Sequence, residues 1–359
     1  MADELIESIL NESRSFPPSK EFSDQANINE AKAEEMKKLA ADDHIKYWAK
    51  LANEELHWSR PFSNTLDDSK APNYEWFNDG EINASYNSLD VNVSKNPHKT
   101  AIIFEKEDGK SESITYKELL LKTSQFANGL KKIGVEPMDR VVIYMPMCPE
   151  AVIAMQACAR IGAIHSVVFG GFSSNALKDR IEDAQSKIVI TADGAFRGGG
   201  VIPLKQATDE AVSQSSFKVN NVVVFKRTGE NVNFNKGTDI WWEDLVADCD
   251  LVCEPKPLNA EHPLFILYTS GSTGKPKGIQ HATAGYILHA KTTFSWIFDI
   301  KNDDVFWCTA DVGWITGHTY VAYGPLLSGA TILIYEGAPT YPDVGRFWSI
   351  CEKHSVTIF

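Results

Sequence analysis

From about residue 99 onward, short runs of apolar residues alternate with longer amphipathic segments. The first apolar runs lie at 140–145, 164–169, 187–191 and 222–225, and the amphipathic segments between them lie at 150–161, 174–184 and 204–212. Short apolar runs are typical of buried strands, whereas the amphipathic segments have the length and spacing of helices. Gly162 directly follows the first of these helices, as a C-cap does. The alternation predicts βαβ units around a parallel sheet.

After a polar stretch at 227–240, the same alternation resumes. Strands are expected at 264–268, 304–309 and 330–334, and helices near 284–296, 318–327 and 343–353. Two such runs predict two stacked α/β subdomains. The last residues, 355–359, form a β-branched run that stops abruptly. Because a buried strand is a poor place for a domain to end, we expect a truncated chain.

The N-terminal region has a different pattern. Residues 1–26 are polar and predict a loosely ordered leader. Residues 28–58 read as helical, with Tyr47, Trp48 and Leu51 on one face. An aromatic-rich connector follows, and aromatic residues at this density indicate packing against a larger body.

Composition narrows the class of protein. The chain has 359 residues, is 43% hydrophobic, and carries a formal net charge of −13. That balance argues against nonspecific binding to nucleic acid or to an anionic membrane. No apolar run has the length of a membrane span, the first residues lack the features of a signal peptide, and the six cysteines form no C-x-x-C pair. We therefore expect a soluble cytoplasmic protein with free thiols.

The segment 264–278 carries the strongest chemical signal. Its apolar half runs directly into a turn rich in glycine, hydroxyl and lysine side chains: Thr269, Ser270, Gly271, Ser272, Thr273, Gly274, Lys275 and Lys277. Backbone N–H groups, hydroxyls and lysines that converge in this way suit phosphate oxygens. The segment is not the G-x-x-x-x-G-K-[ST] loop, because Pro276 follows Lys275. The alternative, a flexible Gly/Ser linker, seldom follows a buried strand so directly.

This segment resembles the phosphate loop of the adenylate-forming superfamily, which includes acyl-CoA synthetases, adenylation domains and luciferases. The resemblance implies that Thr269 to Lys277 hold the β- and γ-phosphates of ATP and later the pyrophosphate. The loop identifies the superfamily but not the acid that is activated.

A second segment, 307–326, places Asp311 and Gly313 at a turn before a predicted helix. A helix start with small residues can receive a carboxylate, although these residues could equally be ordinary core. The run Trp-Ile-Thr-Gly-His after Thr-Ala-Asp-Val-Gly resembles the acyl-pocket motif of acetyl-CoA synthetases. By that resemblance Ile315 and Thr316 line the acetate methyl pocket, and Trp314 and His318 stand beside it. Propionate should be a poorer substrate rather than an excluded one.

Two glycine-rich turns follow predicted strands at 163–173 and 191–205. Strand ends of this kind bind ligands in open α/β sheets, although the glycines could simply form turns. Acetyl-CoA synthetases carry similar motifs. The resemblance implies that Phe169, Gly170, Gly171 and Arg197 contact the nucleotide part of CoA. Some family members have a second basic residue where this chain has Gly200.

Further matches at 74–87, 241–245 and 335–342 extend the resemblance from about residue 28 to the end. It implies an α/β fold, the large N-terminal domain of the adenylate-forming type with stacked βαβ subdomains, truncated before the small C-terminal domain. The implied division is a polar leader at 1–26, an N-terminal cap at 27–87 and an incomplete AMP-binding domain at 88–359.

The implied function is that of an acetate–CoA ligase, in which acetate and ATP·Mg²⁺ give acetyl-AMP and pyrophosphate, and CoA then takes the acetyl group. No catalytic residue or metal ligand is identified within the chain, which we expect to be inactive alone. Two alternatives remain: a propionyl-CoA or other short-chain synthetase, and a catalytically silent nucleotide- or CoA-binding fragment. The expected partners are small molecules (acetate, ATP and CoA), with neither nucleic acid nor membrane.

Overall fold

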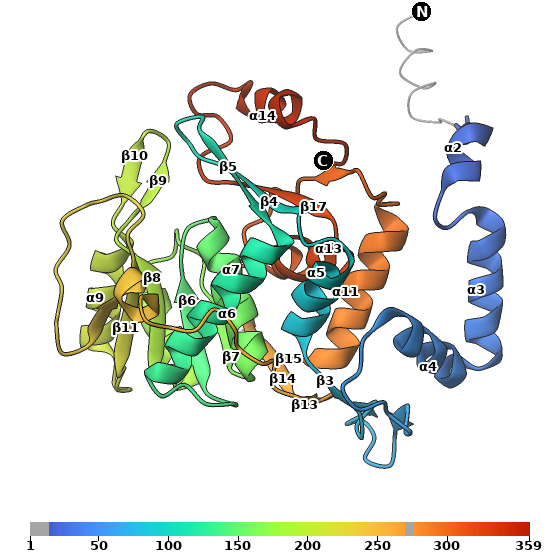
Figure 1. Cartoon of the computed structure of the whole chain (residues 1–359), viewed down its shortest axis with the longest axis horizontal. Helices are drawn as coiled ribbons and strands as arrows, with labels where there is room; N and C mark the ends of the chain where they lie inside the picture. The colour runs from blue at the N-terminus through green and yellow to red at the C-terminus, as the bar shows by residue number, and fades with distance from the viewer. Residues whose placement is uncertain (1–13, 270–275) are drawn as a thin grey trace, which may run out of the picture.

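The structure, a computed structural model, describes residues 14–269 and 276–359 (Figure 1). Its larger sheet has seven strands in the order β12-β11-β8-β6-β7-β14-β15. In chain order these strands are β6 Arg140–Tyr144, β7 Ile164–Val167, β8 Ile188–Ala192, β11 Asn221–Phe225, β12 Asp239–Trp241, β14 Pro263–Thr269 and β15 Lys277–Ala282. All neighbours pair in parallel except β14 and β15, which form an antiparallel pair. The parallel sheet expected from the alternation is confirmed.

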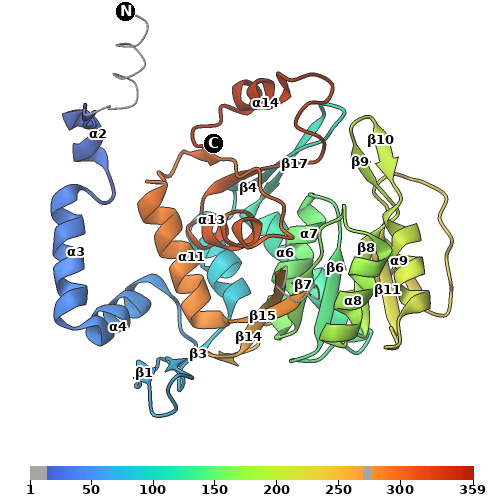
Figure 2. The ribbon, with the colours of Figure 1, turned by 180° about the vertical axis from the view of Figure 1, so that it is seen from behind.

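Helices cover both faces of this sheet (Figures 1 and 2). They are α6 Tyr116–Lys132, α7 Pro149–Ile161, α8 Ser174–Ala184, α9 Leu204–Gln214 and α10 Trp242–Val246. Helices α6 and α10 lie on one side and α8 and α9 on the other, so the strands between them are buried and apolar, as expected for a parallel sheet. Helix α7 ends at Gly162, whose φ of 81° is the left-handed conformation that favours glycine, which confirms the predicted C-cap.

The second sheet has four strands in the order β16-β17-β4-β5. These are β4 Thr100–Glu105, β5 Ser111–Thr115, β16 Val305–Phe306 and β17 Thr331–Tyr335. Strands β16, β17 and β4 pair in parallel, and β5 is antiparallel to β4. The helical segments of this half are α11 Thr283–Ile297, α12 Ile315–Gly317, η2 His318–Tyr323, α13 Gly324–Leu327 and α14 Arg346–His354.

One expectation about the sheets is wrong. The strand at 264–268 was expected in the second run, but β14 pairs in parallel with β7, at Phe265 and His165, and therefore belongs to the larger sheet. Strands β4 and β5, from much earlier in the chain, complete the smaller sheet instead. Position along the chain does not determine which sheet a strand joins, because a long connection can return the chain to either one.

The end of the described chain also differs from the expectation. Residues 355–359 run beside β16, but only Ile358 makes a bridge, to Phe306, so no regular strand forms there.

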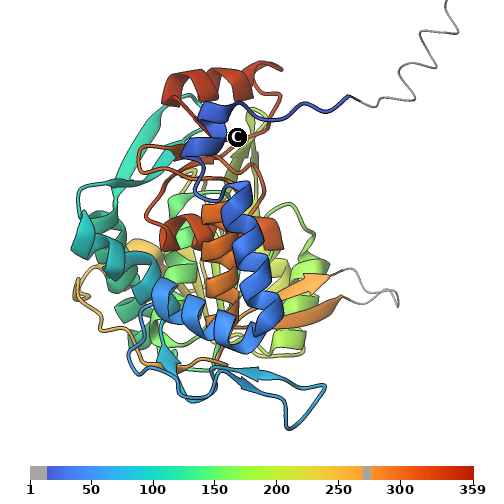
Figure 3. The ribbon, with the colours of Figure 1, turned by 90° about the vertical axis from the view of Figure 1, so that its right-hand side faces the viewer.

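The N-terminal part packs against the second half of the chain. Its elements are α2 Lys20–Gln25, α3 Glu30–Asp42, α4 His44–Glu55, β1 Leu66–Asp67, β2 Glu75–Trp76, β3 Glu81–Ile82, η1 Tyr86–Asp90 and α5 Val91–Lys95. Figure 3 shows the blue N-terminal helices against orange α11, which α4 contacts. The side-chain amide of Asn27 donates to the carbonyls of Ser295 and Ile300, at 3.2 and 3.0 Å. Strand β3 pairs with β13 Leu258–Asn259.

Across the described ranges, no helix combines the length and the apolar character needed to cross a bilayer. All six cysteines are free.

Candidate functional site

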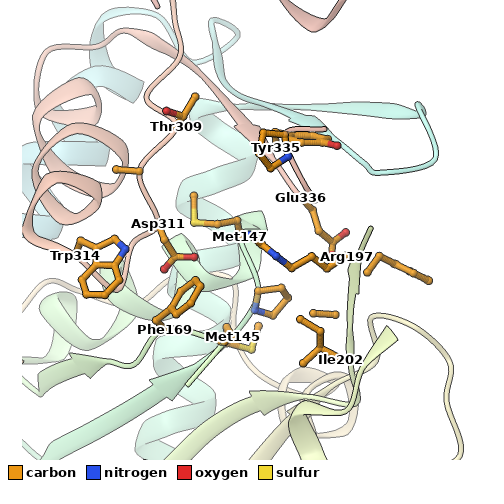
Figure 4. Close-up of a pocket in the computed structure, with 18 of the residues that line it drawn as sticks. Met145, Met147, Phe169, Arg197, Ile202, Thr309, Asp311, Trp314, Tyr335 and Glu336 are labelled. Atoms are coloured by element: carbon orange, nitrogen blue, oxygen red, sulfur yellow. The ribbon is translucent and has the colours of Figure 1, made fainter. Parts of the chain in front are cut away.

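A cavity of about 630 Å³ lies between the two sheets, at the carboxyl ends of their parallel strands (Figure 4). Its walls come from the segments that follow β6, β7, β8, β16 and β17. The lining residues are Met145, Pro146, Met147, Phe169, Gly170, Gly171, Ala195, Phe196, Arg197, Ile202, Trp307, Cys308, Thr309, Ala310, Asp311, Trp314, Tyr335, Glu336, Gly337, Pro339 and Phe347. Open α/β sheets bind ligands at this end of their strands. The structure therefore brings all four predicted CoA residues and Trp314 into one cavity.

Close backbone approach explains why these two sequence segments meet. A Cβ on Gly313 would lie 2.9 Å from the backbone nitrogen of Phe169, so only glycine allows the loop after β16 to touch the loop after β7. The rings of Phe169 and Trp314 are consequently stacked, with centroids 5.8 Å apart. The Tyr144 hydroxyl donates to the carbonyl of Phe172 at 2.8 Å, which fixes the turn that contains Gly170 and Gly171.

The other residues predicted for the acetate pocket lie outside the lining of this cavity. Ile315 and Thr316 are exposed at the start of α12. His318 is fully buried behind them, where its ring stacks against that of His165 at 5.4 Å. Burial lowers the pKa of His318 to about 3, so its imidazole is neutral at physiological pH. His318 is therefore placed to support the loop that carries Trp314, whose carbonyl accepts its backbone N–H at 3.0 Å.

Asp311 is a lining residue that was noted at a turn but not assigned to the site. Its carboxylate accepts the N–H of Gly313 at 2.7 Å and lies beside the ring of Phe169 (Figure 4). Burial raises its pKa to about 6, an effect that the positive charge of Arg197 opposes. Its position directly after a predicted strand was the signal that could have identified it.

Arg197 is the basic side chain among the described residues that line the cavity. It ends β9 Ala195–Arg197, which forms a hairpin with β10 Gly200–Ile202, and its side chain is exposed. Glu336, which follows β17, is a second lining residue that sequence reasoning missed. Its carboxylate is paired with the guanidinium of Arg227, so Arg197 does not compensate it.

Most of the glycine-rich loop lies outside the described residues: Ser270, Gly271, Ser272, Thr273, Gly274 and Lys275. Its two flanks are described, because Thr269 ends β14 and pairs with Lys277 at the start of β15. Both are exposed, and neither lines the cavity. An antiparallel pair therefore closes the base of the loop; β15 was not expected from the sequence.

Arg180 connects this pair of strands to the cavity wall. The guanidinium lies 5.3 Å from the ring centroid of Tyr268 in β14 and 5.0 Å from that of Phe172. The Tyr268 hydroxyl also donates to Asp183 of α8 at 2.7 Å. The base of the predicted phosphate loop is thus held by α8, which begins beside the glycine turn of the cavity.

The described residues contain no group of three or more His, Cys, Asp or Glu side chains that could hold a metal ion.

Comparison with known proteins identifies the family. The AMP-binding enzyme family matches residues 89–359, and the acetyl-coenzyme A synthetase N-terminus matches residues 33–88. The acetyl-coenzyme A synthetase of Chromobacterium violaceum is 56% identical over 356 residues, which are 99% of this chain and 54% of that protein. That of Thiobacillus denitrificans is 56% identical over 357 residues, again 99% of this chain and 54% of the relative.

A solved structure supports the fold. The acetoacetyl-CoA synthetase from Streptomyces lividans superposes with a TM-score of 0.82 at 26% sequence identity, over 89% of this chain and 48% of that one. The chain spans about half the length of the relatives it matches. The expected α/β fold of the adenylate-forming type is confirmed. The chain belongs to the AMP-binding enzyme family, and within it is similar to the acetyl-coenzyme A synthetases.

Proposed function

We propose that this chain supplies the phosphate loop, the CoA site and part of the acetate site of an AMP-forming acetate–CoA ligase. In the first step a carboxylate oxygen of acetate attacks the α-phosphorus of ATP·Mg²⁺, and pyrophosphate leaves. In the second, the CoA sulfur attacks the carbonyl carbon of acetyl-AMP, the thiol proton is lost, and AMP leaves. Both steps depend mainly on positioning and charge stabilisation.

One observation carries the proposal. The four residues assigned to CoA and the tryptophan assigned to the acetate pocket line a single cavity, although they come from three separate segments of the chain. In the second step, the thiol of CoA must meet the acetyl group of acetyl-AMP. This cavity provides such a meeting place, with Phe169 as an aromatic surface and Arg197 as a cation for phosphate.

The phosphate loop and the acetate pocket complete the proposed site. Thr269 to Lys277 bind the β- and γ-phosphates, and Mg²⁺ arrives with ATP rather than in a site built by the described residues. Ile315 and Thr316 favour acetate, and His318 supports them from the core. The setting is the cytoplasm, with acetate, ATP and CoA as the small-molecule partners.

Calorimetric titration of the chain with CoA and with ATP tests the proposal. Wild type is expected to bind both saturably. Arg197→Ala should weaken CoA binding about tenfold, or about 1.4 kcal/mol, because a charge-assisted contact to phosphate is lost. ATP binding should be unchanged in this variant. Wild type that binds neither ligand, or an Arg197→Ala variant that binds CoA like wild type, would contradict the proposed site.

The activated acid is tested separately. Pyrophosphate exchange into ATP, measured with acetate and with propionate, ranks the two acids. Absence of exchange with both acids, together with retained binding of ATP and CoA, is expected both of a ligase portion that is inactive alone and of the silent binding fragment, whereas exchange with either acid would exclude the silent fragment.

A further inference from the structure

Glu107 lies in the turn between β4 and β5 and is 8% exposed, yet no basic side chain of the described residues pairs with it. Its carboxylate instead accepts three backbone N–H groups: those of Gly198 at 2.5 Å, Gly199 at 3.0 Å and Ala338 at 3.3 Å. We call this arrangement the Glu107 clamp. A buried carboxylate satisfied by several backbone N–H groups is an effective fixed point, because removing it leaves those donors unpaired.

The clamp joins three segments that are distant in sequence. Gly198 and Gly199 form the turn of the β9–β10 hairpin, Ala338 follows β17, and Glu107 belongs to the smaller sheet. Figure 2 shows the hairpin and the β4–β5 turn at the same end of the molecule. The hairpin follows β8 of the larger sheet, so the clamp connects the two halves of the molecule next to the residues that line the cavity.

Close packing supports the same geometry independently. A Cβ on Gly199 would lie 2.8 Å from the ring of Tyr341, and a Cβ on Gly337 would lie 3.1 Å from Cγ of Glu107. Both glycines also have positive φ, at 79° and 143°. A larger residue at Gly199 would force the hairpin away from the loop after β17, and one at Gly337 would press against Tyr335 and Glu107.

The clamped turn begins at the residue that follows Arg197. Arg197 supplies the positive charge among the described lining residues, and its own side chain makes no hydrogen bond or ion pair there. No side-chain partner therefore holds the guanidinium, and the region it can reach depends on the backbone from which it extends. Since Gly198 and Gly199 are held by Glu107, the clamp fixes the backbone next to Arg197.

We propose that Glu107 is a positioning residue for Arg197 and thereby sets the affinity of the cavity for the phosphorylated part of CoA. This inference rests on the proposed CoA site. Glu107 does not touch the ligand, since a carboxylate facing phosphates would repel them, and its oxygens are already occupied by backbone donors.

A double-mutant cycle in the full chain tests the inference. Glu107→Gln keeps the size of the side chain but replaces one acceptor by an N–H₂ donor that faces a backbone N–H. We expect CoA binding to weaken about tenfold, the scale of a lost hydrogen bond to a charged group, and ATP binding to be unchanged. In the Arg197→Ala background, Glu107→Gln should have no further effect on CoA binding, because both changes act on one interaction.

The matched control is Glu112→Gln on the neighbouring strand, where an exposed glutamate pairs with Lys106. It should bind CoA like wild type. The inference is overturned if Glu107→Gln also binds CoA like wild type, or if it weakens binding equally with and without Arg197.

Amide hydrogen exchange separates this inference from the proposed function. Exchange at Gly198 and Gly199 should be faster in Glu107→Gln and intermediate in Glu107→Asp, whose carboxylate is one methylene further away. Unchanged exchange in both variants overturns the positioning role, whatever the chain binds. Wild type that fails to bind CoA overturns the proposed site and, with it, the ligand part of this inference, even if exchange responds as expected.

Discussion

The middle of the larger sheet and the strand ends of the smaller one lie on either side of one cavity but are stabilised in different ways. In the larger sheet, every residue of β8 is buried and uncharged, and Ile190 at its centre is fully buried. In the smaller sheet, buried carboxylates sit where two strands end: Glu105 closes β4 and Glu336 follows β17. Apolar burial stabilises in proportion to the area removed from water. Buried charges stabilise only when their partners are complete. The apolar middle of the larger sheet should therefore tolerate small changes, whereas the charged strand ends of the smaller sheet should fail sharply.

Glu105 shows how complete that pairing is. Its two oxygens accept hydrogen bonds from Arg346 at 2.9 Å, Lys353 at 2.7 Å and His354 at 2.8 Å, all from α14. One fully buried side chain thus holds a whole helix over the smaller sheet.

The largest effect is expected from Glu105→Gln. Removing the negative charge leaves the cations Arg346 and Lys353 without their counter-charge and weakens the bond from His354, so the free energy of unfolding should fall by about 3–5 kcal/mol. Urea unfolding measures the loss, and amide exchange should show α14 opening first. Glu112→Gln serves as the exposed control and should change stability by less than about 0.5 kcal/mol. A loss below about 1 kcal/mol for Glu105→Gln would remove the contrast between the sheets.

Asp311→Asn should produce the next largest change in the free energy of unfolding. At high pH this change should be an increase, opposite in sign to the loss expected for Glu105→Gln. Burial raises the pKa of Asp311 from 3.8 to about 6, so the folded state binds this proton more tightly than the unfolded state. Its contribution to stability is therefore favourable below about pH 4 and is lost as pH rises through 6. At pH 8 the buried charge costs up to about 3 kcal/mol, from about 1.4 kcal/mol for each pKa unit.

Melting temperatures between pH 4 and pH 8 check this prediction. Asp311→Asn should stabilise the chain at pH 8 more than at pH 4, whereas Asp248→Asn at an exposed position should show no such difference. An equal effect of Asp311→Asn at both pH values would show that its carboxyl titrates normally.

The smallest effect is expected in the larger sheet. Ile190→Val removes one buried methylene from β8 and should cost about 1 kcal/mol. The loss should be the same at low and high salt, because no charge is involved. Ile279→Val, at a position that is 46% exposed on β15, is the matched control and should cost less. A salt-dependent loss for Ile190→Val would mean that the larger sheet also depends on charge.

The same contrast explains what the sequence could predict. Five strands of the larger sheet, β6, β7, β8, β11 and β14, were recognised because burial on both faces produces continuous apolar runs, as in β6 and β8, whereas its edge strands β12 and β15 were not. The order of strands and the pairing of β14 with β7 could not be predicted, because they depend on long-range contacts that leave no local pattern. The bend of η2, a π-helix at His318–Tyr323, likewise left no signal in the periodicity.

The site was predictable to the same extent. Glycine-rich turns after strands drew attention to Phe169, Gly170, Gly171 and Arg197, the resemblance assigned them to CoA, and the structure brings them into one cavity. Glu107 could not be found in this way. It is a glutamate in a polar turn like many others, and only the folded chain shows that three backbone N–H groups converge on it.

The lining of the cavity runs from Met145 to Phe347, so its walls are separated by some two hundred positions along the chain. During synthesis the larger sheet can form while the smaller one still lacks β16, β17 and α14. Until those elements emerge, the apolar surface near Met145 and Phe169 faces solvent, where it is open to chaperones and to misassembly. Closure of the cavity is therefore expected to be a late event in folding, and slow, because its contacts are among the least local in the molecule.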